Sequence, residues 1–237
     1  MGMFDFFLSE EKKIAKHTRR LTNRDAQPED REASAIWLAN TGNPQAVMGL
    51  LSRFDMNLDH ELKNQVEKDF IYGVLRDLGE AAVEPTRVWL RQCKGMARPL
   101  ALLGALKGPE ASLDAAYEML KIEIGRDEFK PQKKKAILIW LAARKEKVDL
   151  DQVLPFIPDF DEGVRYAAAE VLIAQNTPDA RLPLLTQMVN PDEDSNRVRI
   201  RVAEVFVQRR WSVQEHAEAL VEALPDRFSV HEGRLVG

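Results

Sequence analysis

Two stretches that lie 34 residues apart decide the fold: VRYAAAEVL at Val164–Leu172 and VRIRVAEVF at Val198–Phe206. The offset aligns the leading Val-Arg pairs with each other and the later Glu-Val pairs with each other. In the first stretch, apolar residues recur three and four positions apart, which gives a helix one apolar face. We therefore interpret the stretch as one copy of a repeated helical unit and not as the lining of an active site.

Two further copies stand upstream of this pair. DREASAIWL at Asp30–Leu38 aligns with the Val164–Leu172 copy, and the match continues so that Pro44 falls on Pro178. KKAILIWLA at Lys134–Ala142 shares the string Ile-Trp-Leu-Ala with the Asp30 copy. A period in the thirties is typical of helical solenoids. Two less regular copies fit in the gap of 103 residues that separates the upstream copies: 58–79 and 96–108.

Each unit is predicted to hold two helices. Asp161 or Glu162 starts the helix of the 164–172 copy, because a carboxylate satisfies the free N–H groups and the positive dipole of a helix start. Asn176-Thr177-Pro178 then ends this helix and begins the next, since proline is tolerated in a first turn. Almost no strand is expected, because no sustained alternation of apolar and polar residues is present. Similar breaks recur at Gly42–Pro44, Gly79–Glu80, Gly108–Pro109 and Asn190–Pro191.

A turn acid, then Val-Arg-x-x-Ala-Ala-x-x-Leu, then a partner helix with paired leucines resembles the HEAT repeat, including its bacterial, phycobilisome-lyase-type variety. The motif is strongest at Asp161–Met188, good at Asp30–Leu51 and Val198–Phe206, weaker at Lys134–Ala142 and poor between residues 58 and 120. The resemblance implies an all-α fold: a right-handed α-solenoid, or armadillo-like superhelix, of about six helical pairs. Stacked neighbours supply the core of such a fold.

The expected organisation is one solenoid domain at residues 1–225, of which 1–21 form an N-terminal capping segment, and a C-terminal tail at 226–237. The apolar run Phe4–Phe7 is interpreted as a seal over the open end of the solenoid, and the alternative is an exposed docking peptide. A lone helix at Ser212–Leu224 would end the solenoid. The tail would be poorly ordered or folded back on the last unit.

Composition limits the classes of function. The 237 residues are 45% hydrophobic and 30% charged, which argues against global disorder. A formal net charge of −4 argues against a basic nucleic-acid binder, although it does not exclude a local basic patch. Cys93 is the only cysteine, which excludes an intramolecular disulfide and a cysteine-based zinc site. No stretch suits a membrane span and no signal peptide is recognised, so the expected location is the cytoplasm.

The candidate binding residues are the basic positions of the repeats and their neighbours. In the HEAT-like repeats that the chain resembles, such an arginine usually bonds the turn acid of its own or a neighbouring repeat. Asp161 or Glu162 would serve Arg165, and Asp30 would serve Arg31. The ladder of basic residues is therefore either structural, with paired charges, or a concave surface for an acidic partner. The candidates for that surface are Arg31, Lys134, Arg165, Tyr166, Arg197, Arg199 and Arg201.

The sequence contains no recognisable catalytic motif, and no cofactor or metal is expected. His60-Glu61 and His231-Glu232 resemble the His-Glu pairs of HEAT-like diiron hydroxylases, but that family needs four such pairs. The sequence therefore predicts a non-enzymatic adaptor that holds a protein partner on its concave face, without nucleic acid or membrane. The alternative is a nucleic-acid-binding HEAT-like protein or HEAT-like DNA glycosylase. That alternative requires Arg165, Arg199 and Arg201 to project together, free of acidic partners.

Overall fold

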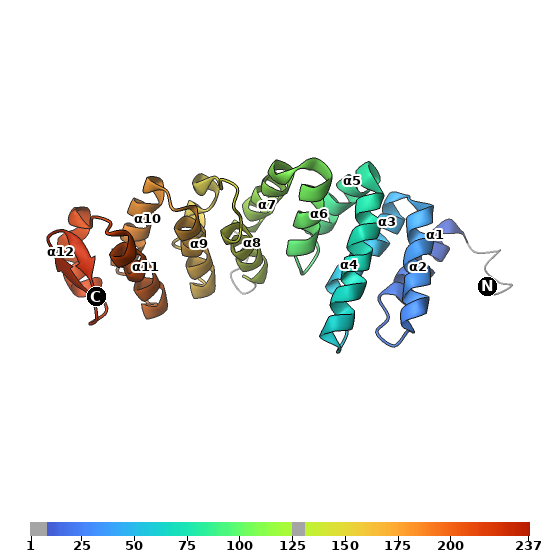
Figure 1. Cartoon of the computed structure of the whole chain (residues 1–237), viewed down its shortest axis with the longest axis horizontal. Helices are drawn as coiled ribbons and strands as arrows, with labels where there is room; N and C mark the ends of the chain where they lie inside the picture. Colours follow the sequence, from blue (N-terminus) through green and yellow to red (C-terminus); the bar gives the residue numbers. More distant parts are fainter. Residues whose placement is uncertain (1–8, 125–130) are drawn as a thin grey trace. The chain divides into compact units, whose positions relative to one another are not determined.

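A computed structural model of the chain describes residues 9–124 and 131–237 (Figure 1). These residues are mostly helical with little strand, which confirms the expected all-α class. No helix among them is long and apolar enough to cross a membrane. The run Phe4–Phe7, and with it the prediction of an N-terminal seal, lies outside the described residues.

The chain divides into two compact units, Met1–Met119 and Leu120–Gly237, and the boundary falls inside helix α7 (Pro109–Glu123). We call them unit 1 and unit 2. The sequence prediction of one domain over residues 1–225 does not anticipate this division. In a repeat protein each repeat contacts only its neighbours. The repeat pattern in the sequence therefore does not mark where one compact unit ends and the next begins.

Helices α1 to α4 of unit 1 pack around an apolar cluster. Leu38, Leu50 and Leu75 are fully buried in this cluster and come from three different helices. Gly42 adopts a left-handed conformation with φ of 65° and ends α2, where only glycine is free of steric cost. The helices are α1 (Glu10–Leu21), α2 (Pro28–Thr41), α3 (Pro44–Leu51), α4 (Glu61–Asp77), α5 (Val83–Leu90) and α6 (Ala97–Lys107), with 3-10 turns at Ser52–Asp55 and Gly79–Ala82.

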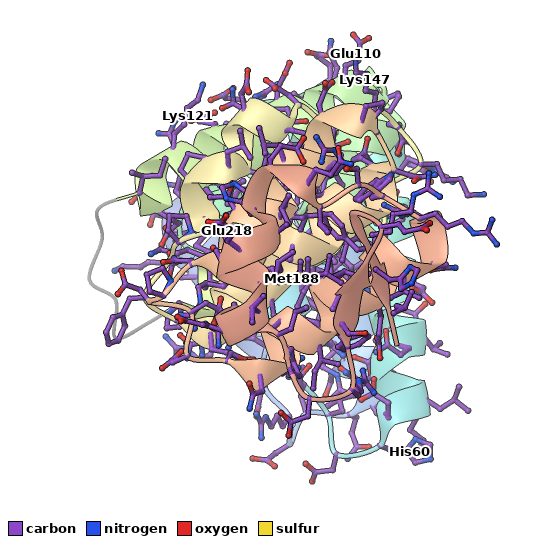
Figure 2. The ribbon with its side chains drawn as sticks, turned by 90° about the vertical axis from the view of Figure 1, so that its left-hand side faces the viewer. His60, Glu110, Lys121, Lys147, Met188 and Glu218 are labelled. Carbon is purple, nitrogen blue, oxygen red and sulfur yellow. The ribbon has the colours of Figure 1, made fainter. Side chains whose placement is uncertain are left out.

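Unit 2 contains the repeats that are clearest in the sequence. Helices α8, α9 and α11 lie side by side, and α10 packs against α9 and α11 (Figure 1). Met188 of α10 is fully buried among them (Figure 2). The α-helices of this unit are α8 (Gln132–Ala142), α9 (Glu162–Gln175), α10 (Pro178–Val189), α11 (Asn196–Arg209) and α12 (Ala217–Ala223). Three 3-10 turns accompany them at Leu150–Gln152, Leu154–Phe156 and Gln214–His216.

The start of α9 settles which acid caps the central repeat. Asp161 is the N-cap, and its Oδ1 accepts a hydrogen bond from the Val164 backbone N–H at 2.9 Å. Glu162 is instead the first residue of the helix. At the other end, Asn176 closes α9 in a left-handed conformation with φ of 50°. The breaks read from the sequence therefore coincide with real helix ends in this repeat.

Loss of this cap gives a local stability prediction. Asp161→Ala should lower the free energy of unfolding of unit 2 by about 1 kcal/mol, because the Val164 N–H loses its side-chain acceptor. Asp161→Asn should cost much less, since asparagine caps helices about as well as aspartate. Urea unfolding followed by circular dichroism compares the two variants, and equal losses would show that the carboxylate charge matters more than the cap.

The C-terminal residues form a small hairpin. Strands β1 (Ser229–His231) and β2 (Arg234–Val236) pair antiparallel, with Val230 opposite Leu235. Leu235 is 3% exposed and anchors β2, which contacts α11. The helix expected over 212–224 is shorter and is preceded by a 3-10 turn. Both strands that the described residues contain belong to this hairpin. It occupies the C-terminal tail, for which the sequence predicted either poor order or folding back on the last unit.

Candidate functional site

Arg165, the central residue of the basic ladder, is buried and uses its whole guanidinium group on this chain. Its Nε and Nη2 donate to the two carboxylate oxygens of Glu193 at 2.9 and 2.8 Å, and Nη2 also reaches Asp194 at 2.7 Å. Its Nη1 donates to the backbone carbonyls of Asp159 and Phe160. These hydrogen bonds, with Glu193 first, raise the pKa of Arg165 above its usual value. Arg165 therefore clamps the turn before α9 to the turn before α11.

Arg31 repeats this geometry in unit 1. Its Nε and Nη2 donate to the two oxygens of Glu67 at 3.0 and 2.6 Å. Its Nη1 donates to backbone carbonyls in the turn before α2, including that of Ala26. Lys134 makes a simpler version of the contact, with Nζ 3.0 Å from Asp159 Oδ2. In each case the acid follows its basic residue in the chain, from helix α4 for Glu67 and from a loop for Asp159. We call this arrangement the interrepeat clamp.

A second buried arginine shares the clamp of unit 1. The Arg53 side chain is fully buried and lies 3.0 Å from Glu67 through Nη2. It also donates to Asn64 Oδ1 and to the Met56 carbonyl. Burial by itself would raise the pKa of Glu67, but hydrogen bonds and charge from Arg31 and Arg53 lower it below the ordinary 4.5. Glu67 thus carries a negative charge that compensates two buried cations.

The clamps correct the list of candidate binding residues. Arg31, Lys134 and Arg165 are 4%, 3% and 7% exposed, so they are not part of an accessible surface. Their contacts agree with the structural alternative, in which each basic residue pairs with an acid of the same chain. The acids, however, are not the ones that the sequence predicted. Asp161 caps α9 instead of serving Arg165, and Asp30 lies 3.7 Å from Arg20. The partners that sequence reasoning missed are Glu67, Asp159 and Glu193.

Arg199 occupies the ladder position at the end of unit 2 and differs from the other members. Its Nη2 donates to the Asn190 carbonyl at 3.1 Å, and its Nε is buried without a hydrogen-bond partner among the described residues. Glu193 follows Arg165 by 28 positions, whereas the residue 28 positions after Arg199 is Arg227. Arg227 pairs with Glu204 instead. Among the described residues no ion pair joins Arg199 to a downstream acid, so the last copy does not form a clamp.

The other three candidates come together between α9 and α11. The guanidinium of Arg197 stacks over the Tyr166 ring, 3.8 Å from its centroid, and approaches Glu162 at 3.4 Å. Arg201 pairs with Glu170, and the hydrogen bond to Glu170 raises the pKa of Arg201. Tyr166 follows the buried Arg165 by one position, which is enough to turn its side chain to another side of α9.

A pocket of about 540 Å³ lies next to this cluster. Ile139 of α8 forms one wall with a side chain that is 61% exposed, and Tyr166 and Glu170 of α9 form the opposite wall. Its lining combines apolar surface with charges of both signs. We call it the α8–α9 groove, lined by Lys135, Ile139, Ala142, Ala143, Gly163, Tyr166, Ala167, Glu170 and Arg197.

Comparison with protein-family models, with curated proteins and with solved structures found no match to this chain. The nucleic-acid alternative requires three arginines without acidic partners. Arg165 and Arg201 each hold a carboxylate, and Arg199 donates to a backbone carbonyl. The requirement fails at two of the three positions.

Unit 1 has a smaller pocket of about 280 Å³ between α2 and α4. Val66 and Phe70 of α4 form an apolar rim, and Arg31, Arg53 and Glu67 line its polar part. Those three polar side chains already bind one another in the clamp. We therefore rank this pocket below the α8–α9 groove as a binding site.

The histidine-glutamate pairs do not converge within either unit. His60 is the N-cap of α4 in unit 1, where its Nδ1 accepts from the Lys63 backbone N–H. His231 lies in the hairpin of unit 2. Within the described residues, no group of three or more histidine, cysteine, aspartate or glutamate side chains is placed to hold a metal ion.

Proposed function

We propose that the chain is a HEAT-like α-solenoid that acts as a non-enzymatic adaptor, and that the α8–α9 groove binds a peptide segment of a protein partner. The observation that carries the proposal is the pairing of a largely exposed Ile139 with Tyr166 stacked under Arg197 in one groove. Tyrosine and arginine are enriched among the residues that dominate binding energy at protein interfaces. An aliphatic side chain beside them gains further by leaving water.

The groove suits a segment with one apolar anchor and charged neighbours. Its volume of about 540 Å³ is large enough for several side chains. Lys135, Arg197 and Glu170 place charges of both signs at the rim, and each of them also pairs with another residue of unit 2. Charges at a rim steer association and select partners more than they add affinity. The affinity is therefore expected to come from the apolar anchor that contacts Ile139 and Tyr166.

A peptide-display selection on the full chain tests the proposal. Enriched peptides should share an apolar anchor, and fluorescence anisotropy then measures their Kd. Ile139→Glu and Tyr166→Ala should each weaken binding by at least about tenfold, because each removes apolar contact area from the centre of the interface. Both side chains are accessible in the groove, so the variants should keep the helical circular dichroism of the unaltered chain.

A matched control is available in the same unit. Val221 of α12 is 78% exposed and does not line the groove. Val221→Glu therefore makes the same kind of change on another surface, and the selected peptides should bind it with unchanged Kd. Peptides that bind Ile139→Glu and the unaltered chain equally well would place the binding surface elsewhere and overturn the proposed groove.

A further inference from the structure

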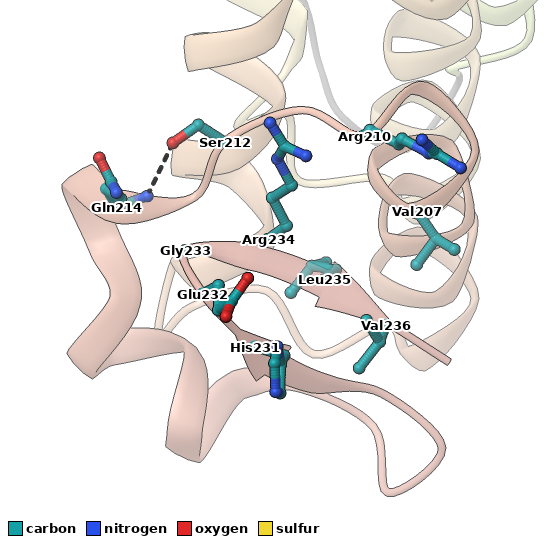
Figure 3. Close-up of a pocket in the computed structure, with 10 residues that line it drawn as sticks. All are labelled: Val207, Arg210, Ser212, Gln214, His231, Glu232, Gly233, Arg234, Leu235 and Val236. Carbon is teal, nitrogen blue, oxygen red and sulfur yellow. Dashed lines mark hydrogen bonds between the residues drawn. The ribbon is translucent and has the colours of Figure 1, made fainter.

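A second cavity, separate from the α8–α9 groove, opens where the end of α11 meets the C-terminal hairpin (Figure 3). Its volume is about 760 Å³. Three segments contribute to it: the last turn of α11, the loop that follows, and the β1–β2 hairpin. The lining includes Arg210, Ser212, Glu232 and Arg234.

The backbone around this cavity is fixed by several contacts. The Val213 N–H donates to the Gly233 carbonyl at 2.9 Å, and Ser212 forms an antiparallel bridge with Arg234. Gly233 has φ of 72°, and a Cβ at this position would lie 2.7 Å from Gln214 Cγ. The hairpin turn therefore fits closely against the loop. These contacts fix the backbone positions from which the rim side chains extend.

Arg210 and Arg234 are the cations of the cavity lining, and their guanidinium groups are not neutralised. In the described part of the chain, neither group makes an ion pair or a side-chain hydrogen bond. Other arginines of unit 2 form ion pairs: Arg181 pairs with Glu215, and Arg227 pairs with Glu204. In Figure 3, Arg234 extends from β2 toward Ser212, and Arg210 stands at the end of α11.

Ser212 adds a neutral donor to this side of the cavity. Its Oγ accepts a hydrogen bond from the Gln214 backbone N–H at 3.3 Å, which leaves the hydroxyl hydrogen available. Glu232 is the one acid among the described residues of the lining, and it pairs with neither arginine. Arg210, Arg234 and Ser212 thus line one cavity, and their side chains have donors that no hydrogen bond to the described residues uses.

We propose that this cavity binds a phosphate monoester group through Arg210, Arg234 and Ser212. Guanidinium groups bind phosphate through paired, charge-assisted hydrogen bonds, and a phosphate has three oxygens to accept them. The group can come from a small phosphorylated molecule or from a phosphorylated side chain of a peptide. The inference does not depend on the α8–α9 groove.

Isothermal titration calorimetry on the full chain tests the site with inorganic phosphate, O-phosphoserine and a capped phosphoserine peptide, at constant ionic strength. One saturable site is expected. Arg234→Gln and Arg210→Asn should each weaken phosphate binding by about tenfold or more. Asparagine is chosen at position 210 because Arg210 has φ of 51°, which asparagine tolerates. Glu232→Asn should tighten binding, since it removes a negative charge while keeping a residue that accepts φ of 49°.

The control is Arg227→Gln, an exposed arginine of the same unit that pairs with Glu204 outside the cavity lining. It should leave the affinity for phosphate unchanged. Tighter binding of the peptide than of inorganic phosphate would identify a phosphorylated side chain as the source, and equal binding would identify a small molecule. The proposal is overturned if both Arg210→Asn and Arg234→Gln bind phosphate normally, or if acetate binds as tightly as phosphate.

Discussion

Glu67→Gln is expected to lower the free energy of unfolding of unit 1 by about 3–5 kcal/mol, the usual cost of removing one partner from a buried ion pair. The Glu67 carboxylate accepts from Arg31 and from Arg53, whose side chains are 5% and 0% exposed. Glutamine keeps the shape and one acceptor, but leaves two buried cations without a negative charge. Native-state hydrogen exchange of α2 and α4 measures the loss, because these helices carry Arg31 and Glu67.

The control for this variant is Asp69→Asn on the same helix. Asp69 pairs with Arg98 at 2.7 Å, but its side chain is 69% exposed. Exposed pairs contribute up to about 1 kcal/mol, so this variant should be close to the unaltered chain. Similar losses for the two variants would contradict the assignment of Glu67 as the central charge of unit 1.

The same network gives unit 1 a pH dependence. The pKa of Glu67 lies below the ordinary 4.5, since the two arginines outweigh the opposing effect of burial. As the pH falls, the unfolded chain therefore takes up this proton before the folded chain does. The stability contributed by Glu67 is complete above pH 4.5 and is lost as the pH falls through the lower pKa of the folded state. Urea midpoints of Glu67→Gln should lack this part of the acid sensitivity.

Arg165→Met is expected to destabilise unit 2 by about 3–5 kcal/mol. The Glu193 side chain is 0% exposed and would lose the guanidinium that pairs with it. The turns before α9 and α11 would also lose the donor that joins them. Urea unfolding by circular dichroism, with hydrogen exchange of α9 and α11, measures the effect.

Two comparisons make this result specific. Arg227→Gln breaks an exposed ion pair of the same unit and should change stability by less than about 1 kcal/mol. The double variant Arg165→Met/Glu193→Gln should be more stable than Arg165→Met alone, because it no longer buries an unpaired charge. A double variant that loses the sum of the two single effects would show that Arg165 and Glu193 act independently.

The helices could be predicted because the copies of the repeat share the same spacing of apolar residues. Val164, Ala168 and Leu172 are all fully buried on α9, as the three- and four-residue spacing indicated. The clamp partners were not predictable to the same degree. The acid follows its basic residue by 36, 25 or 28 positions, so no fixed offset reveals it. Arg53 lies outside the repeat motif and gave no signal at all.

The candidate site was predicted in part. Sequence spacing placed Arg165 and Tyr166 together as surface candidates, but adjacent residues on a helix point in directions about 100° apart. That rotation buries Arg165 and leaves Tyr166 beside Ile139, a residue that the sequence did not single out. The hairpin was missed because its strands are three residues long, too short for alternation to be recognised. Its Glu232-Gly233 turn was the available signal.

The interrepeat clamp also sets where this chain can be divided or its modules transplanted. A fragment that stops at Asn190 would retain α9 and α10 intact, yet Arg165 would have lost Glu193 and Asp194. The self-sufficient module is therefore longer than a pair of helices, because it includes the acid of the following turn. Grafting one repeat into another array would require this downstream carboxylate to travel with it, or the arginine to be replaced by an uncharged residue.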